Sequence, residues 1–285
     1  MKPASFSYHA PATIDEALTL LTNLSESDGR ILAGGQSLVP TMAFRLARPG
    51  HLIDINGIKA LQQIAVQDNE LVIGAGVRHG AFHESVCEGP LGAMLSSVVN
   101  HIAHLPIRMR GTFCGSLAHA DPASEWCAVA VTLDATIVAR STGGERQISA
   151  REFFQGVMTT ALADDELLVE VRLPILSQNT RFGFQEFSRR AGDFALTMAL
   201  AVWEDDGGRI SNARIGLGGV EDRPRRILEA EEALNGSVPS DKVFRSAADL
   251  AAGVVDPMED HATSGTYRRD LVRALTRRAC EQAIK

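Results

Sequence analysis

Two glycine-bearing segments, far apart in the chain, carry the residue types that could bind a phosphate group. The first is AGGQSL at 33–38 and the second is RGTFCGSLAHADP at 110–122. Glycines let main-chain N–H groups converge on an anion, because no Cβ stands in the way. Serine and threonine hydroxyls can donate to phosphate oxygens. Neither segment has the spacing of the usual nucleotide-binding loop, and together they suggest one bound dinucleotide.

The first segment lies between a short strand that ends at Leu32 and a helix expected over 38–46. Gly34 and Gly35 can adopt positive φ angles, and Ser37 can either cap the helix or donate its hydroxyl to a phosphate. An ordinary strand-to-helix turn closed by a serine cap explains the same residues, since paired glycines are common in turns.

The second segment repeats the combination of glycine with hydroxyl side chains, at Thr112, Gly115 and Ser116. Asp121 precedes Pro122, and an N-cap followed by proline predicts the start of a helix over 123–133. The Asp121 carboxylate could instead accept hydrogen bonds from ribose or ribityl hydroxyls. Glu125 could reach the same ligand, or it could be an exposed first-turn glutamate that the helix dipole stabilises.

Further stretches of the chain, in a fixed order, carry a family resemblance. They are FSYHAPATIDEALTLL at 6–21, LIDINGI at 52–58, GSLAHADPASE after the second glycine segment, DDELLVEVRLP at 164–174, FSRRAGDFAL at 187–196 and IGLGGVEDRPRR at 215–226. With the two glycine segments, the chain resembles the flavoprotein (medium) subunits of molybdenum hydroxylases. That family includes aerobic carbon monoxide dehydrogenase, bacterial xanthine dehydrogenase and related N-heterocycle or aldehyde dehydrogenases. The resemblance covers nearly the whole chain.

This resemblance implies an α+β protein. Residues 1–176 would form a two-part FAD-binding domain of the PCMH or vanillyl-alcohol-oxidase-like type. Residues 177–285 would form a C-terminal domain with an antiparallel sheet and helices. The resemblance also implies FAD as cofactor, a small [2Fe–2S] subunit and a large molybdenum-cofactor subunit as partners, and an external electron acceptor such as a quinone or NAD.

The resemblance assigns cofactor-binding roles to residues in matching positions. The first FAD pyrophosphate loop would comprise Ala33, Gly34, Gly35, Gln36, Ser37 and the adjoining Leu38. The second would comprise Thr112, Phe113, Cys114, Gly115 and Ser116. Asp121 or Glu125 would bind toward the ribityl and adenosine part, Leu168 would line the flavin pocket, and Ile102 would lie against the isoalloxazine ring. No catalytic residue and no metal ligand is assigned.

Three departures or additions accompany these assignments. Cys114 stands where relatives commonly have glycine, and we expect its side chain to point into the core, as free cysteines usually do. Arg78 stands where relatives often have threonine, and no role is assigned to it. The turn 189–193 would lie near the flavin and shape the pocket or its acceptor side, although a surface ion pair is an alternative.

Composition restricts the function classes. A chain of 285 residues with 45% hydrophobic content can bury a full core and is long enough for two domains. The net charge of −7 argues against a nucleic-acid partner or an anionic membrane. The N-terminus shows no apolar signal region and no apolar run of membrane-spanning length occurs, so a cytoplasmic protein is expected.

The four cysteines and the histidines do not predict a metal centre. No CxxC pair is present, so the iron–sulfur clusters must belong to another subunit. His101 and His104 have the spacing of one helix face, but the sequence offers no third ligand near them.

Two other function classes compete with the flavoprotein subunit. A self-contained nucleotide-dependent oxidoreductase would use IGAGVRHG at 73–80, whose glycines are spaced one residue too widely for the dinucleotide fingerprint. A cofactor-free assembly protein is the third class, and the hydroxyls of Ser37, Thr112 and Ser116 argue against it.

Hydrophobic periodicity and turn residues predict the elements. Besides those above, helices are expected at 14–24, 80–87, 91–103, 227–235, 241–252 and 267–284. Strands are expected at 51–55, 63–66, 71–75, 135–140, 145–148, 167–173, 182–189, 196–204 and 210–217, with a domain boundary at 177–180. The arginines of the last helix are expected to form a solvated rim opposite its apolar face.

Overall fold

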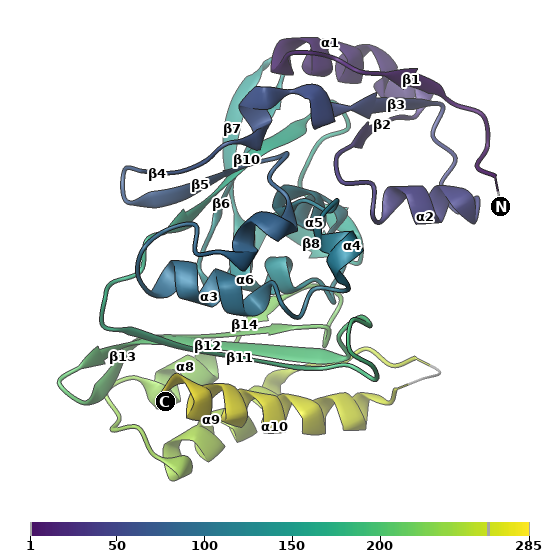
Figure 1. Ribbon diagram of the computed structural model, residues 1–285. Helices are drawn as coiled ribbons and strands as arrows, with labels where there is room; N and C mark the ends of the chain where they lie inside the picture. Colours follow the sequence, from purple (N-terminus) through teal and green to yellow (C-terminus); the bar gives the residue numbers. More distant parts are fainter. Residues whose placement is uncertain (1, 261–262, 285) are drawn as a thin grey trace.

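The structure is a computed structural model that describes residues 2–260 and 263–284. A small sheet lies at one end of the molecule, and a sheet covered by the C-terminal helices lies at the other (Figure 1). A five-stranded sheet and the helices within residues 90–132 lie between them. The mixture of helices with mainly antiparallel sheets confirms the predicted α+β class.

The small sheet is parallel and has the order β1-β3-β2. Its elements are β1 (Ser7–His9), α1 (Ile14–Leu24), β2 (Gly29–Leu32), α2 (Leu38–Ala43) and β3 (His51–Asp54). Helix α1 starts where predicted, because Thr13 accepts a hydrogen bond from the Glu16 N–H. Helix α2 ends before the predicted residue 46, since the chain turns at Arg45, whose φ is 58°. Strand β1 was not predicted.

The five-stranded sheet is antiparallel, with the order β4-β5-β10-β6-β7. Its strands are β4 (Ile64–Gln67), β5 (Glu70–Gly74), β6 (Thr136–Ser141), β7 (Gly144–Ser149) and β10 (Leu167–Pro174). The sequence predicted all of them. Three short elements connect β7 to β10: α7 (Ala150–Phe153), β8 (Phe154–Gly156) and β9 (Thr159–Thr160).

The middle of the molecule departs most from the prediction. Its helices are α3 (Pro90–Val98), α4 (Leu105–Arg108), α5 (Phe113–His119) and α6 (Glu125–Thr132). The helix predicted over 80–87 is wrong, because only a 3-10 turn, η4 (His79–His83), forms there. The remaining 3-10 turns are η1 (Ser25–Ser27), η2 (Ile55–Gly57) and η3 (Lys59–Gln62). Helix α3 ends before His101 and His104, so these histidines do not share a helix face.

The C-terminal sheet is antiparallel, with the order β11-β12-β13-β14. Its elements are β11 (Thr180–Phe187), β12 (Thr197–Asp206), β13 (Arg209–Gly218), β14 (Arg225–Arg226), α8 (Leu228–Leu234), α9 (Asp241–Val254) and α10 (Gly265–Ala283). Strands β11 to β13 and the three helices agree with the prediction to within a few residues at each end, whereas β14 was not predicted.

Strand β12 is buried on both faces. Met198, Leu200 and Val202 belong to the core shared with the N-terminal part of the chain. The alternate residues Ala199, Ala201 and Trp203 belong to the core under the C-terminal helices. Since successive side chains of a strand point to opposite faces, this one strand joins two hydrophobic cores.

The arginines of α10 do not all form a solvated rim. Arg268 is only 5% exposed, and its guanidinium donates to the Leu196 and Gly219 carbonyls and pairs with Asp260 at 2.8 Å. The prediction was wrong for this residue because α10 packs on β11 and β12, and Arg268 reaches the carbonyls that lie just before β12 and just after β13. Arg273 and Arg278 are exposed, as expected.

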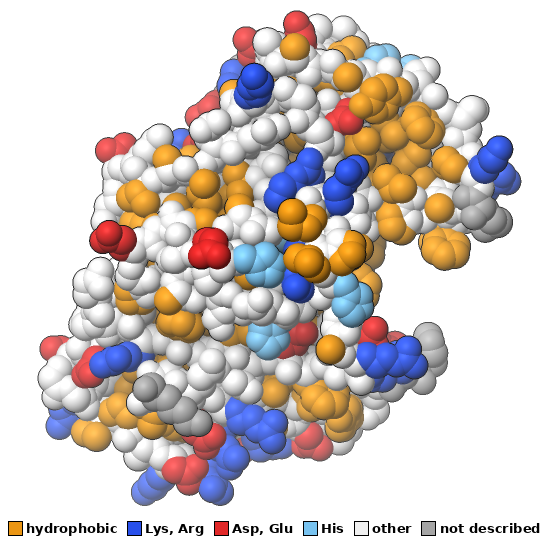
Figure 2. Space-filling view, viewed as in Figure 1, with side chains coloured by type: hydrophobic (Ala, Val, Ile, Leu, Met, Phe, Trp, Pro, Cys, Tyr) orange, Lys and Arg blue, Asp and Glu red, His pale blue; other side chains and the backbone are white. Residues whose placement is uncertain are grey.

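Apolar side chains gather on the surface at the N-terminal end of the molecule (Figure 2). The large exposed apolar residues of this part of the chain are Phe6, Tyr8, Val39, Phe44 and Leu46. An apolar group of this kind is typical of a surface that another protein covers. No helix in the described part of the chain combines the length and apolar character needed to span a bilayer.

Candidate functional site

The first glycine segment forms an open loop between β2 and α2. Gly35 has a φ of 71°, and the Gln36 amide holds the turn by donating to the Gly34 carbonyl at 3.0 Å. Ser37 occupies the N-cap position of α2, but its hydroxyl makes no capping bond. The backbone N–H groups of residues 34–37 find no acceptor among the residues that the structure describes. A simple serine-capped turn is therefore wrong, and these donors are free for a ligand.

The second glycine segment forms the short helix α5, which the sequence did not predict. Thr112 is its N-cap and accepts a hydrogen bond from the Gly115 N–H at 3.0 Å. The hydrogen of the Thr112 hydroxyl remains available as a donor. Phe113 is fully buried, packs on Trp126 with 4.8 Å between ring centroids, and donates its N–H to Val77. The Phe113 ring therefore anchors the segment in the core.

The two segments touch each other through their backbones. A Cβ added to Gly34 would lie 2.5 Å from the Arg110 carbonyl oxygen and 2.5 Å from the Gly111 Cα. No real Cβ tolerates such distances to backbone atoms, so the contact requires glycine at position 34.

Arg78 connects the same two segments. Its guanidinium donates to the Arg110 carbonyl and to the Asn56 side-chain oxygen. Asn56 in turn donates to the Ala33 carbonyl at 2.7 Å. A single arginine and a single asparagine therefore fix the position of one loop relative to the other, a role that the sequence did not reveal.

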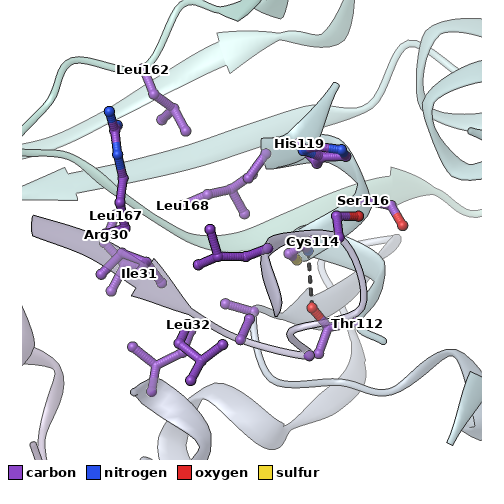
Figure 3. A pocket seen from close by; sticks show the side chains of 18 of the residues that line it. Arg30, Ile31, Leu32, Thr112, Cys114, Ser116, His119, Leu162, Leu167 and Leu168 are labelled. Atoms are coloured by element: carbon purple, nitrogen blue, oxygen red, sulfur yellow. Dashed lines mark hydrogen bonds between the residues drawn. The ribbon is translucent and has the colours of Figure 1, made fainter. Parts of the chain in front are cut away.

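Both segments line one cavity of about 610 Å³, within the usual size range of small-molecule sites. Figure 3 shows Ile31 and Leu32 on β2, Leu167 and Leu168 on β10, and Thr112 and Ser116 of the second segment around it. The cavity is also lined by Met158, Thr159, Thr160, Leu162, Ala163 and Asp164. Roles for these residues and for Arg30, His79 and His119 were not predicted, because none of them is a glycine or a hydroxyl residue beside a glycine.

Most of the predicted cofactor residues line this cavity. They are Ala33, Gly34, Gly35, Gln36, Ser37, Leu38, Thr112, Cys114, Gly115, Ser116 and Leu168. Ile102, Phe113, Asp121 and Glu125 do not line it. Asp121 is also not the predicted helix cap, because its carboxylate accepts from the Ala123 N–H at 2.9 Å and Ser124 precedes the helix, which begins at Glu125.

Cys114 points into the core, as expected. Its thiol donates to the Ile73 carbonyl at 3.4 Å, and the residue is 2% exposed. Burial raises the pKa of this thiol far above its ordinary value, so it stays protonated and unreactive.

A thiol-reactive maleimide is therefore expected to leave Cys114 unmodified in the folded protein. Cys127 and Cys280 are buried as well, and only Cys87 is partly exposed. Mass spectrometry after brief labelling should find modification confined to Cys87, whereas labelling in denaturant should modify every cysteine. Rapid native modification of Cys114 would contradict the buried orientation.

Two buried carboxyl groups, one on α6 and one on β11, lie near enough to influence each other's charge. Glu125 is 9% exposed, so the alternative of an exposed first-turn glutamate is wrong. Burial raises its pKa to about 7. On β11, burial and then the charge of Glu125 raise the pKa of Glu186 to about 8. The His101 Nδ1 lies 4.0 Å from a Glu186 oxygen, and burial lowers the pKa of that imidazole. Both carboxyl groups therefore keep a proton at pH values where an exposed glutamate is ionised.

The stability that these two carboxyl groups contribute to the chain without cofactor is expected to fall as pH rises from about 4.5 to about 8. Over this range the two carboxyl groups bind more protons in the folded state than in the unfolded state, so their contribution to the free energy of unfolding decreases with pH. Glu186→Gln should flatten this dependence, as measured by urea unfolding at several pH values. The exposed variant Glu84→Gln is the matched control and should keep the wild-type slope, and an unchanged slope in Glu186→Gln would contradict the assignment.

Comparison with known proteins identifies the family. Residues 4–176 match the FAD binding domain in molybdopterin dehydrogenase. Residues 182–283 match the CO dehydrogenase flavoprotein C-terminal domain. The chain belongs to the FAD-binding medium subunits of the molybdenum hydroxylases. It is 36% identical to the nicotine 6-hydroxylase medium subunit of Paenarthrobacter nicotinovorans, over 99% of each chain.

Solved structures agree with this assignment. The medium subunit is similar to a chain of carbon monoxide dehydrogenase from Hydrogenophaga pseudoflava, with a TM-score of 0.95, 34% identity and coverage of 100% of this chain and 99% of the other. It is also similar to quinoline 2-oxidoreductase from Pseudomonas putida 86, with a TM-score of 0.92, 39% identity and coverage of 99% and 98%. The predicted family, the FAD cofactor and the oxidoreductase class are confirmed.

The residues present in the medium subunit fit FAD. Unpaired N–H groups at 34–37 and the Ser37 hydroxyl border the same cavity as Thr112 and Ser116. The competing IGAGVRHG segment lacks the strand-to-helix geometry of a dinucleotide fingerprint, because β5 leads into a turn and then η4. Its Gly74 instead allows close packing, since a Cβ there would lie 2.4 Å from the Leu61 carbonyl.

Proposed function

We propose that this medium subunit is the FAD-carrying electron-transfer subunit of a three-subunit molybdenum hydroxylase. It receives electrons from the [2Fe–2S] clusters of a small subunit and delivers them to an external acceptor, such as a quinone or NAD. A large subunit holds the molybdenum cofactor and the substrate site. Residues 1–176 form the FAD-binding domain and residues 177–285 the C-terminal domain.

FAD, when bound, supplies the exchange between one-electron and two-electron transfer that such a chain of carriers needs. The protein's own residues bind and orient it. The N–H groups of residues 34–37 and the hydroxyls of Ser37, Thr112 and Ser116 donate to the pyrophosphate. Leu168 excludes water from the pocket. Phe113 contributes by anchoring α5, as its side chain and N–H are both engaged in the core.

Three residues outside the cavity have proposed roles toward the rest of FAD. Asp121 or Glu125 binds toward the ribityl and adenosine part, and Ile102 lies against the isoalloxazine ring. The turn 189–193 shapes the acceptor side. Its Gly192 has a φ of 84°, and a Cβ there would lie 2.4 Å from the His104 ring, so the turn contacts the FAD-binding domain closely.

The observation that carries the proposal is the set of unpaired N–H groups at 34–37, which border one cavity with the hydroxyls of the second segment. Unpaired backbone donors are uncommon in folded proteins unless a ligand or water satisfies them. A buried apolar groove alone would not favour an anionic ligand.

Relatives of similar length support placing the substrate site elsewhere. Their names refer to three different substrates: nicotine, caffeine and carbon monoxide. These relatives are nevertheless similarly close to this chain, at 36%, 36% and 33% identity. Such different substrates, combined with such similar medium subunits, favour a substrate site on the large subunit. The apolar surface formed by Phe6, Tyr8, Val39, Phe44 and Leu46 is a candidate contact for a partner subunit.

The test is an absorbance spectrum of the purified chain before and after incubation with FAD and removal of the excess. Retained flavin bands at about 450 nm are expected. The FAD-loaded chain, reduced without oxygen, should then be reoxidised by its acceptor, and NAD and a soluble quinone are compared in parallel. A chain that takes up no FAD, either alone or with its partner subunits, would overturn the proposal.

A further inference from the structure

His79 lies where the two FAD loops meet, at the start of η4. It is 4% exposed and lines the cavity. Its backbone N–H donates to the Gly111 carbonyl at 3.0 Å. Its ring edge faces the same glycine, because a Cβ added to Gly111 would lie 2.5 Å from the His79 Nε2. The imidazole therefore sits directly behind the contact between the loops.

A buried tryptophan determines which ring nitrogen of His79 carries the hydrogen. The Trp126 indole N–H lies 2.9 Å from the His79 Nδ1. An indole nitrogen can only donate, so Nδ1 must be the acceptor and must lack a hydrogen. A neutral ring in this arrangement carries its hydrogen on Nε2.

The ring is neutral under ordinary conditions. Burial, followed by the charges of Arg78 and Arg108, lowers the pKa of His79 to about 4. Trp126 is fully buried and packs against Phe82 and Phe113. The ring orientation is therefore fixed by the hydrophobic core as well as by one hydrogen bond.

The Nε2–H of His79 has no acceptor within the described part of the chain. The Nε2 atom is not fully shielded from solvent. In this it differs from the unpartnered buried oxygens of Ser96 and Glu186. His79 lines the cavity, and its Nε2 lies beside Gly111, at the contact between the loops.

We propose that His79 is a cofactor-binding residue whose Nε2–H donates a hydrogen bond to a pyrophosphate oxygen of FAD, with Trp126 as the residue that fixes its tautomer. This inference rests on the proposed function of the two loops. A neutral donor orients the pyrophosphate without adding a charge, so its contribution does not vary with pH over the neutral range.

Two substitutions separate the nitrogens of the ring. In His79→Asn, an amide oxygen near the Nδ1 position can still accept from Trp126, but the donor at Nε2 is lost. In His79→Gln, an amide N–H near the Nε2 position can still donate, but the acceptor for Trp126 is lost. The dissociation constants of FAD and of ADP, which shares the pyrophosphate, are measured by titration for wild type and both variants, alongside urea unfolding.

His79→Asn is expected to bind both FAD and ADP roughly 10-fold to 100-fold more weakly, as for loss of a hydrogen bond to a charged group. Its unfolding should resemble that of wild type. His79→Gln is expected to be less stable than wild type, while its dissociation constants for FAD and ADP stay within about 3-fold of the wild-type values. That change is smaller than the loss of one hydrogen bond to a charged group would cause.

A second readout needs no substitution. Nitrogen-15 NMR of the wild-type imidazole should show the hydrogen on Nε2, and ADP should slow the exchange of that hydrogen with solvent. Unchanged FAD affinity in His79→Asn, weakened FAD binding with unchanged ADP binding, or a hydrogen on Nδ1 would each overturn the inference while leaving the FAD site intact. A wild-type chain that binds neither FAD nor ADP would instead overturn the proposed function, and the inference with it.

Discussion

Replacing Gly34 by alanine is expected to weaken FAD binding by at least about 100-fold, the loss of two hydrogen bonds to a charged ligand. The new methyl group would lie 2.5 Å from the Arg110 carbonyl oxygen and 2.5 Å from the Gly111 Cα. Both neighbours are backbone atoms, so no side-chain rotation relieves the clash and the two loops must separate. Donors on the two loops then no longer reach the same pyrophosphate.

Titration of FAD into the purified variant checks this prediction, with urea unfolding as a measure of stability. Overpacking costs about 1–3 kcal/mol, so the fold should persist. Gly253→Ala is the matched control, because nothing lies within 4 Å of its added Cβ and it sits inside α9. That variant should keep wild-type FAD affinity and gain up to about 1 kcal/mol of stability. Wild-type FAD affinity in Gly34→Ala would show that the loops do not bind the cofactor together.

Replacing Arg268 by methionine is expected to lower the free energy of unfolding by about 2–6 kcal/mol, because two carbonyl groups lose their buried donor. The substitution leaves the carbonyls of Leu196 and Gly219 without the guanidinium that now donates to them at 2.5 and 2.6 Å. A buried acceptor without a partner costs about 1–3 kcal/mol. The Gly219 N–H also donates to the Pro122 carbonyl at 2.7 Å, so the loss reaches the junction with the FAD-binding domain.

Arg278→Met on the same helix is the control for that experiment. Arg278 is exposed, and surface substitutions usually change stability by less than about 0.5 kcal/mol. Urea unfolding of both variants, followed by tryptophan fluorescence, measures the difference. Equal stability of the two would mean that the buried guanidinium is replaceable by an apolar side chain of similar length.

The cavity lining could be predicted where residue type alone restricts the backbone. Gly34 and Gly35 are needed for a close approach and a positive φ, and such requirements are visible in a sequence. His79 and Arg78 were not predictable as site residues. Their roles depend on Trp126 and Asn56, which are distant in sequence and come close only through the fold.

The helices and strands were likewise predictable only where their own residue types decide the local structure. Strands β5 and β10 carry enough apolar, β-favouring residues to be located from the sequence. The glycine and hydroxyl residues of α5 resemble a loop, yet Thr112 caps it and Phe113 and Leu117 anchor it in the core. The opposite error occurred over 80–87, where the residues are compatible with a helix but form no α-helix. Burial of the His79 and Phe82 side chains holds this segment in a 3-10 turn instead.

The position of β10 has a consequence for the order of folding. It pairs with both β5 and β6 in the middle of its sheet, although it follows both in the chain. During synthesis, the two earlier strands therefore present unpaired edges until residues 167–174 have left the ribosome, and exposed strand edges favour aggregation. Because Leu167 and Leu168 also line the cavity, the proposed FAD site is completed only at that late stage, and fragments truncated before β10 should be recovered as insoluble, flavin-free protein.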